Sequence, residues 1–230
     1  MALDGGAARV ELCQALGLGG LTPSAGVIEA AVELAHAGSA SAFVHVLVRP
    51  RGGGFMYDAD EVDTIVRDIR QARVLGAHGV VVGAMTDVGS LDLDAVTAFL
   101  DAAEGLDVTV HRVVDASVDP IASVIALAGT HGVRRVLTSG GANDCRTGLA
   151  TLTRMTSEVR GALEVMAGGG VTLADIGPLA AAGVDAVHLS ARSRASRGGP
   201  SGPGGGEVGF DTTDGALVRA AVETARSLGR

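Results

Sequence analysis

One short pattern recurs four times along the chain and limits its fold more than any other feature. Each copy has a glycine, a small apolar residue and two variable residues, followed by residues typical of a short strand. The copies begin at Gly6, Gly76, Gly132 and Gly183. Three of them follow a segment with helical periodicity, and glycine suits the left-handed conformation that closes a helix before a strand. We therefore expect a strand soon after each of these glycines.

Strands of a second kind alternate with these four, and helical segments join the two kinds. The second kind consists of apolar runs with few charges, at residues 43–48, 107–111 and 163–167. Apolar residues recur with helical spacing in the segments 59–75, 93–104, 120–130, 148–160 and 173–182. Because strands that alternate with helices pair in parallel, the chain is expected to form a parallel sheet.

The number of strands predicts a barrel that lacks one strand. The two kinds of strand form three complete pairs, and the partner of the strand after Gly6 would lie before Met1. Seven strands and one absent partner give the eight of a TIM-like (β/α)8 barrel, a fold of ~250 residues. We expect one such domain over residues 1–230 without its first strand, so that either the start site is misplaced or the barrel has an open seam. An open doubly wound sheet ranks second, because no Gly-x-Gly-x-x-Gly pattern follows a first strand.

The C-terminal part differs in composition from the rest of the chain. Residues 191–209 are rich in glycine and contain two prolines, which predicts a flexible loop within the domain. Residues 211–228 return to helical spacing and are expected to form a final helix.

Composition argues against two classes of partner. Aromatic residues make up only 2% of the chain, whereas a stacking platform for nucleic acid needs aromatic faces. The net charge is −8 and no dense run of Lys and Arg occurs, so we expect no nucleic-acid partner. No uncharged apolar run approaches the ~20 residues of a membrane span, so we expect no membrane partner. Two cysteines do not make a disulfide framework, which favours a reducing compartment.

Polar residues gather where the predicted strands end, which is the edge that carries the site in barrels of this kind. Arg49 and Arg51 stand where a buried strand gives way to three glycines, and guanidinium groups beside bare backbone N–H groups favour an anion. A second turn, Gly168-Gly169-Gly170, precedes a helix that Thr172 could cap, as in the phosphate sites of many barrels.

Further candidates lie at the ends of other strands. Glu11 and His111 could serve as acid and base, and Arg112 and Ser139 could contact a ligand. We expect these residues to face one cavity together with Arg49 and Arg51. The structural alternative is that any one of them only stabilises a turn.

Soft side chains that could hold Cu(I) are few and widely spaced in the sequence. The candidates are Cys13, Met56, His111, Cys145 and His188. The chain has no Cys-x-x-Cys or His-x-x-x-His spacing. Cys13 and Cys145 belong to strands well apart around a barrel, so we predict that they do not share a metal and that Cu(I) binding is weak.

Several longer runs together resemble the CutC copper-homeostasis family, in the right order over nearly the whole chain. They are Arg9-Val10-Glu11-Leu12-Cys13, Gly19-Gly20-Leu21-Thr22-Pro23-Ser24, Arg49-Pro50-Arg51-Gly52-Gly53, His111-Arg112 with Asp115, Leu137-Thr138-Ser139-Gly140 and Ala167-Gly168-Gly169-Gly170-Val171. The resemblance implies a TIM-like barrel, a cytoplasmic homodimer or larger assembly, and a role in binding or trafficking Cu(I), with no established reaction. Cys13 is the cysteine that matches the family. The chain departs from the family in lacking the cysteine-bearing first strand.

Two functions are therefore open at this point. The first is a CutC-like protein of copper homeostasis that binds Cu(I). The alternative is a TIM-barrel enzyme that acts on a small anionic or phosphorylated metabolite at the C-terminal rim. Ligand chemistry separates them, because arginines and backbone N–H groups bind anions whereas Cu(I) needs soft groups close together.

Overall fold

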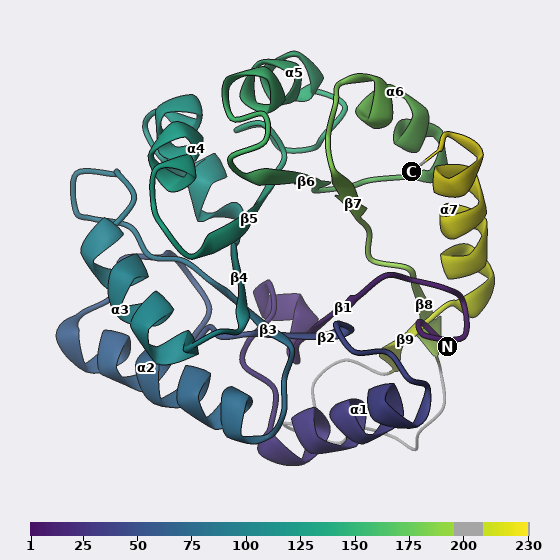
Figure 1. Cartoon of the computed structure of the whole chain (residues 1–230), viewed down its shortest axis with the longest axis horizontal. Coiled ribbons are helices and arrows are strands. Elements are labelled where there is room, and N and C mark those ends of the chain that lie inside the picture. Colours follow the sequence, from purple (N-terminus) through teal and green to yellow (C-terminus); the bar gives the residue numbers. More distant parts are fainter. Residues whose placement is uncertain (196–208, 230) are drawn as a thin grey trace.

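A computed structural model of the chain describes residues 1–195 and 209–229. Seven parallel strands form one curled sheet in sequence order (Figure 1). The strands are β1 (Val10–Leu12), β2 (Val44–Leu47), β3 (Gly79–Val82), β4 (Asp107–Val110), β5 (Val133–Thr138), β6 (Glu164–Gly168) and β7 (Ala186–His188). The strands predicted from the sequence are confirmed, and so is their parallel pairing.

Helices surround the outside of the curled sheet (Figure 1). They are α1 (Ala25–Ala37), α2 (Ala59–Val74), α3 (Leu93–Ala103), α4 (Pro120–Ala128), α5 (Leu149–Glu158), α6 (Ile176–Ala181) and α7 (Gly215–Ser227), with 3-10 turns η1 (Leu16–Leu18), η2 (Arg112–Ala116) and η3 (Leu173–Asp175). The predicted capping box of Thr172 and Asp175 is present at η3. Asp58, Asp92 and Asp119 cap α2, α3 and α4, which fixes where each helix begins.

The sheet curls like a TIM barrel but does not close. β1 pairs with β2 and β7 pairs with β6, and within the described residues neither strand has a partner on its other edge. All residues of β2 and β3 are buried, whereas those of β1 and β7 are only half-buried. The prediction of seven strands and an open seam between the two edges is confirmed.

The repeated glycines have the conformation that the pattern predicts. Gly76, Gly132 and Gly183 have φ of 85°, 99° and 85°, and Gly6 has φ of 81°. An L-residue with a side chain is strained in this region, so glycine is needed for the sharp reversal from helix to strand.

The core is built almost entirely from aliphatic side chains and forms two clusters. One lies beneath the first helices around Ile65 and Phe99, and the other lies beneath the later helices around Leu127, Leu152 and Met155. The buried faces of the strands are rich in valine, whose branched side chain packs well in a parallel sheet.

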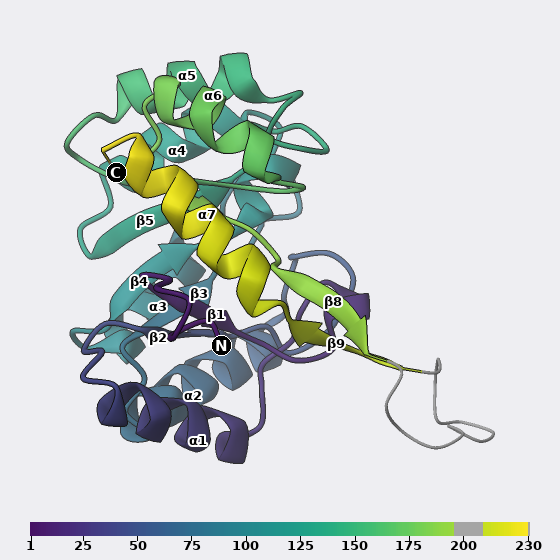
Figure 2. The ribbon, with the colours of Figure 1, turned by 90° about the vertical axis from the view of Figure 1, so that its right-hand side faces the viewer.

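A small antiparallel hairpin follows the seven-stranded sheet. β8 (Arg192–Ala195) pairs with β9 (Phe210–Thr213). The predicted loop 191–209 therefore begins with strand residues, and its residues 196–208 lie outside the described part of the chain. The predicted start of the last helix at residue 211 is wrong, because Asp214 accepts hydrogen bonds from Ala216 N and Leu217 N and starts α7 there. Figure 2 shows α7 lying across the outside of the molecule between the two ends of the sheet.

Candidate functional site

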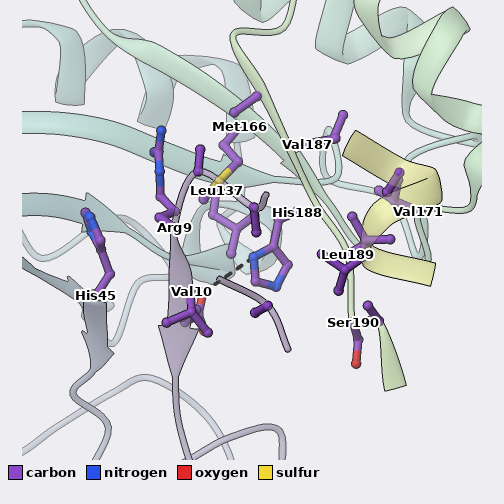
Figure 3. A pocket seen from close by; sticks show the side chains of 18 of the residues that line it. Arg9, Val10, His45, Leu137, Met166, Val171, Val187, His188, Leu189 and Ser190 are labelled. Atoms are coloured by element: carbon purple, nitrogen blue, oxygen red, sulfur yellow. Dashed lines mark ion pairs between the residues drawn. The ribbon is translucent and has the colours of Figure 1, made fainter. Parts of the chain in front are cut away.

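A cavity of about 1130 Å³ lies inside the curled sheet and extends to the seam. Its lining includes polar groups from the rim, namely Glu11, Cys13, Arg49, His111, Arg112 and His188. Figure 3 shows how side chains of β1 and β7 approach one another across it. The curled sheet thus collects the strand ends around one space, as the sequence predicts.

Arg49 holds two loops of the rim together. Its guanidinium donates to Leu18 O at 3.0 Å and Gly20 O at 3.2 Å on one loop, and to Gly53 O on the other. It also lies 5.1 Å from the ring centroid of Phe55, a cation–π distance. Only 6% of Arg49 is exposed, so its charge sits in a largely buried position among carbonyl oxygens.

The imidazole ring of His111 is neutral and lies near the Arg49 guanidinium. Burial and the nearby Arg49 guanidinium lower the pKa of His111 to about 3. Its Nδ1 accepts a hydrogen bond from Val113 N, which places the proton of the neutral ring on Nε2. Because Nε2 then donates and cannot accept, His111 in this state is not a general base.

Glu11 and His188 face each other across the seam. Glu11 Oε2 lies 3.8 Å from His188 Nδ1, and the dashed line in Figure 3 marks this pair. The two side chains come from the unpaired edges of the sheet, β1 and β7. Among the described residues, this is the closest contact between an acidic and a basic side chain of the two edges.

Asp115 organises the rim around Arg112. Its carboxylate accepts hydrogen bonds from Arg112 Nε at 2.7 Å, Ser139 N at 2.9 Å and Gly141 N at 2.9 Å. The second guanidinium nitrogen of Arg112 donates to Ser139 Oγ at 2.7 Å. This network fixes the Arg112 side chain, which also lines the cavity.

The two cysteines differ in position but not in protonation. Burial, followed by the charge of Glu11, raises the pKa of Cys13 to about 11. Burial also raises the pKa of Cys145 to about 11. Cys13 lines the large cavity, whereas Cys145 lines a separate space of about 280 Å³ beside Asp175. The described residues contain no group of three or more His, Cys, Asp or Glu side chains placed to hold a metal.

The structure brings together most of the predicted site residues but not all of them. Those that line the cavity are Glu11, Cys13, Arg49, His111, Arg112, Gly169 and Gly170. Arg51, Ser139 and Gly168 do not line it. Arg51 instead pairs with Glu61 at 3.0 Å on the outside, Ser139 is occupied by Asp115 and Arg112, and Gly168 packs against Leu137 and His188.

Two important residues of the rim have no role in the sequence interpretation. Phe55 lies between Arg49 and His111, with its ring centroid 4.8 Å from that of His111. Asp115 belongs to the residues that carry the family resemblance, and its own chemistry predicts no site role. The role of Phe55 could be predicted, because it is a lone aromatic residue in a glycine-rich loop. The role of Asp115 could not, because its hydrogen bonds join separate loops and no local sequence pattern indicates them.

Comparisons with known proteins agree on one family. The model of the CutC family matches residues 1–193. A CutC family protein of Xanthomonas campestris is 42% identical over 192 residues, which cover 83% of this chain and 78% of that protein. The human copper homeostasis protein CutC homologue is 38% identical over 195 residues, covering 84% and 69%.

Solved structures give the same result at the level of the fold. A copper homeostasis protein CutC from Streptococcus agalactiae superposes with a TM-score of 0.73 and 32% identity, covering 78% of this chain and 87% of that one. Dihydrodipicolinate synthase from Bacillus clausii superposes with a TM-score of 0.56 at 13% identity, covering 89% and 55%, which shows the shared barrel fold alone. The chain is therefore a TIM-like barrel protein. It belongs to the CutC family.

The resemblance read from the sequence is thus confirmed. None of the helices in the described part of the chain combines the length and apolar character needed to cross a membrane.

Proposed function

We propose that this chain acts in copper homeostasis and that the rim cavity is where it holds Cu(I). The supporting observation is the position of Cys13, the one thiol among the residues that line this cavity. Relatives at 38% identity and above carry a CutC name, and the human relative is named for copper homeostasis. Thiolate sulfur is the ligand type that Cu(I) prefers.

The surroundings of Cys13 favour weak binding. Its pKa of about 11 means that Cu(I) must displace a proton before the thiolate forms. Met166 and His188 line the same cavity and offer a thioether and an imidazole as further soft groups. Cys145 lies in the separate space and is not part of this proposal.

A growth experiment tests the role. Cells that lack their own CutC protein should regain growth in excess copper when they express this chain, and Cys13→Ser should lose that effect. Cys145→Ser is the matched control, because it removes the other free thiol, and it should behave as the unmodified chain does. Equal growth with Cys13→Ser and with the unmodified chain, at equal protein levels, would contradict the proposal.

Location and assembly belong to the same proposal. We expect a cytoplasmic protein of one domain over residues 1–230, since a thiol that serves copper must stay reduced. We also expect a homodimer, as the family resemblance implies. Light scattering on the purified chain measures its mass, and a value for a single chain at micromolar concentration would contradict the homodimer.

A small anion is a second candidate ligand for the same cavity, and Arg49 is the observation that favours it. The hydrogen bonds of this buried guanidinium reach carbonyl oxygens, so no carboxylate neutralises it within the described residues. Arg112 and the turn at Gly169 and Gly170 line the same space. In this form of the proposal Glu11 and His111 would contact the anion as proton acceptor and proton donor.

Inorganic phosphate tests the second candidate. Binding should raise the melting temperature more than sodium chloride of equal ionic strength does. Arg112→Gln should reduce that difference, whereas Arg160→Gln, an exposed change in the turn after α5, should leave it unchanged. An equal response to both salts would exclude an anion site that phosphate can fill.

A further inference from the structure

We propose that Arg49 and His111 bind the carboxylate group of a small organic acid through two N–H groups, and that the ring of Phe55 turns aside to admit it. This site rests on the small-anion form of the proposed function, and it assigns the class of the anion and the side chains that contact it. Arg49 follows β2 and His111 follows β4, so neither residue belongs to the unpaired edges of the sheet.

Arg49 keeps one nitrogen without a partner. Its Nη1 donates to the carbonyl oxygens of Leu18 and Gly20, and its Nη2 donates to that of Gly53. Its Nε is buried and has no hydrogen-bond partner. The Tyr57 hydroxyl lies near Arg49, but it too is buried without a hydrogen bond. A carboxylate has two acceptor oxygens, so one oxygen can accept from Nε while the other accepts from a neighbouring donor.

His111 supplies that second donor. Its Nδ1 accepts from Val113 N at 3.2 Å, so the proton is on Nε2, which is buried and has no partner. Gly83 leaves room for the ring, because a Cβ at this position would lie 2.8 Å from His111 Cε1. Arg49 and His111 are each only 6% exposed, and both line the rim cavity. Buried N–H groups without an acceptor are costly, and the oxygens of a ligand would remove that cost.

The charge of these groups matches an anion with a single negative charge. Arg49 forms no salt bridge among the described residues, whereas Arg112 in the same cavity is paired with Asp115 at 2.7 Å. Burial and the Arg49 charge keep the His111 ring neutral, with a pKa of about 3. One unpaired positive charge and two free N–H groups suit a carboxylate, which has one charge and two acceptor oxygens. A phosphate group carries ~1.5–2 negative charges and three acceptor oxygens, which exceeds both counts.

Phe55 controls access to the two donors. Its ring centroid lies 5.1 Å from Arg49 Cζ and 4.8 Å from the ring centroid of His111, so one ring packs against both side chains. The main chain of Phe55 is fixed, because Met85 N donates to Phe55 O at 2.9 Å. The ring itself is half-buried and lines the cavity. Rotation of this side chain toward the cavity therefore uncovers Arg49 Nε and His111 Nε2 without a movement of the loop.

Acetate is the probe, and NMR of the chain with 15N-labelled histidines observes the site directly. The chain has 6 histidines, and His111→Phe identifies the His111 signal by removing it. The Nε2–H proton of His111 should move downfield as acetate is added, because it enters a hydrogen bond to a charged acceptor. Acetamide, the neutral isostere of acetate, and sodium chloride at equal ionic strength should leave the signal where it is.

Matched variants locate the carboxylate, with saturation transfer to the acetate methyl group as the measure of affinity. His111→Phe keeps an aromatic ring and should weaken binding about tenfold, the effect of one hydrogen bond to a charged group. His131→Phe, at an exposed position before β5, and Tyr57→Phe should leave binding unchanged. Phe55→Ala should strengthen binding several-fold, because acetate no longer has to displace the ring. If His111→Phe does not fold, Phe55→Ala and the NMR signal of the unmodified chain still decide the question.

Four results would overturn the proposal. They are a His111 Nε2–H signal that acetate does not move, an equal response to acetamide, weaker binding in Phe55→Ala, and loss of binding in Tyr57→Phe with binding retained in His111→Phe. Inorganic phosphate separates this proposal from the one it rests on. Phosphate that binds as tightly as acetate would keep the anion site and overturn its assignment to a carboxylate. No response to either anion would exclude the anion site as well, and neither outcome affects copper binding at Cys13.

Discussion

Glu11 Oε2 and His188 Nδ1 lie 3.8 Å apart on the two facing edges of a sheet that does not close. The contact joins the first strand of the sheet to the last. It is a long, partly solvated pair, with 34% of the His188 side chain exposed. The two edges are therefore held near one another mainly by the curl of the sheet and by α7, and only slightly by this pair.

Removing the pair should accordingly change stability little. Glu11→Gln is expected to change the free energy of unfolding by less than ~1 kcal/mol in either direction, because the 3.8 Å contact is too long for a hydrogen bond and the pair is partly open to solvent. Urea unfolding followed by circular dichroism measures the change. A loss of ~3 kcal/mol or more would contradict the account, because it would make this contact the main closure of the seam.

Asp115 should contribute much more to the free energy of unfolding than the Glu11–His188 pair does. Asp115→Ala removes the acceptor of Arg112 Nε, Ser139 N and Gly141 N at once and leaves these donors without a partner. We expect a loss of ~3–5 kcal/mol of unfolding free energy, the range for breaking a largely buried ion pair. Asp119→Ala removes only the cap of α4 and should cost ~1 kcal/mol in the same urea experiment. Similar losses in the two variants would show that the network around Asp115 is not a structural centre.

The buried histidines should make the protein sensitive to mild acid. The folded-state pKa of His111 is about 3 and that of His45 about 4, both below the ordinary 6.5. Below pH 6.5 the unfolded chain binds protons that the folded chain does not, so stability is fully present above that pH and decreases as pH falls. Each histidine contributes up to ~1.4 kcal/mol of loss per pH unit in the window between its two pKa values.

Urea unfolding at pH 7.5, 6.5, 5.5 and 4.5 measures this dependence. His111→Gln should make the loss between pH 6.5 and 4.5 smaller, while His131→Gln, at an exposed position, should leave it as in the unmodified chain. An unchanged pH dependence in His111→Gln would show that His111 is protonated in the folded state at these pH values.

The strands and the seam could be predicted because their signals are local. The conformation with φ near 85° requires glycine, so the sequence shows a glycine at each of these junctions. Counting the alternating strands of the two kinds then shows that one edge of the sheet has no partner. Cys13, Arg49 and His111 could be assigned to one rim for the same reason, since the ends of parallel strands meet at one edge of a sheet.

Other features depend on contacts between residues far apart in the sequence, which no local sequence pattern predicts. Arg51 has a residue type and a loop position that suit an anion site, but Glu61, at the third position of α2 and in its capping box, takes up the guanidinium. The network of Asp115 joins η2 to the end of β5 and the loop after it, and two of its donors, Ser139 N and Gly141 N, are main-chain groups that any sequence carries. The hairpin of β8 and β9 pairs strands that are separated by the Gly- and Pro-rich segment, so its register could not be read from that segment.

Titration with Cu(I) in competition with a chelator of known affinity tests the functional proposal most directly. The proposal predicts weak binding by the unmodified chain that strengthens as pH rises toward the Cys13 pKa of about 11. It also predicts that binding disappears in Cys13→Ser and is unchanged in Cys145→Ser. Binding that Cys13→Ser leaves untouched would contradict the account and place the metal away from the rim cavity.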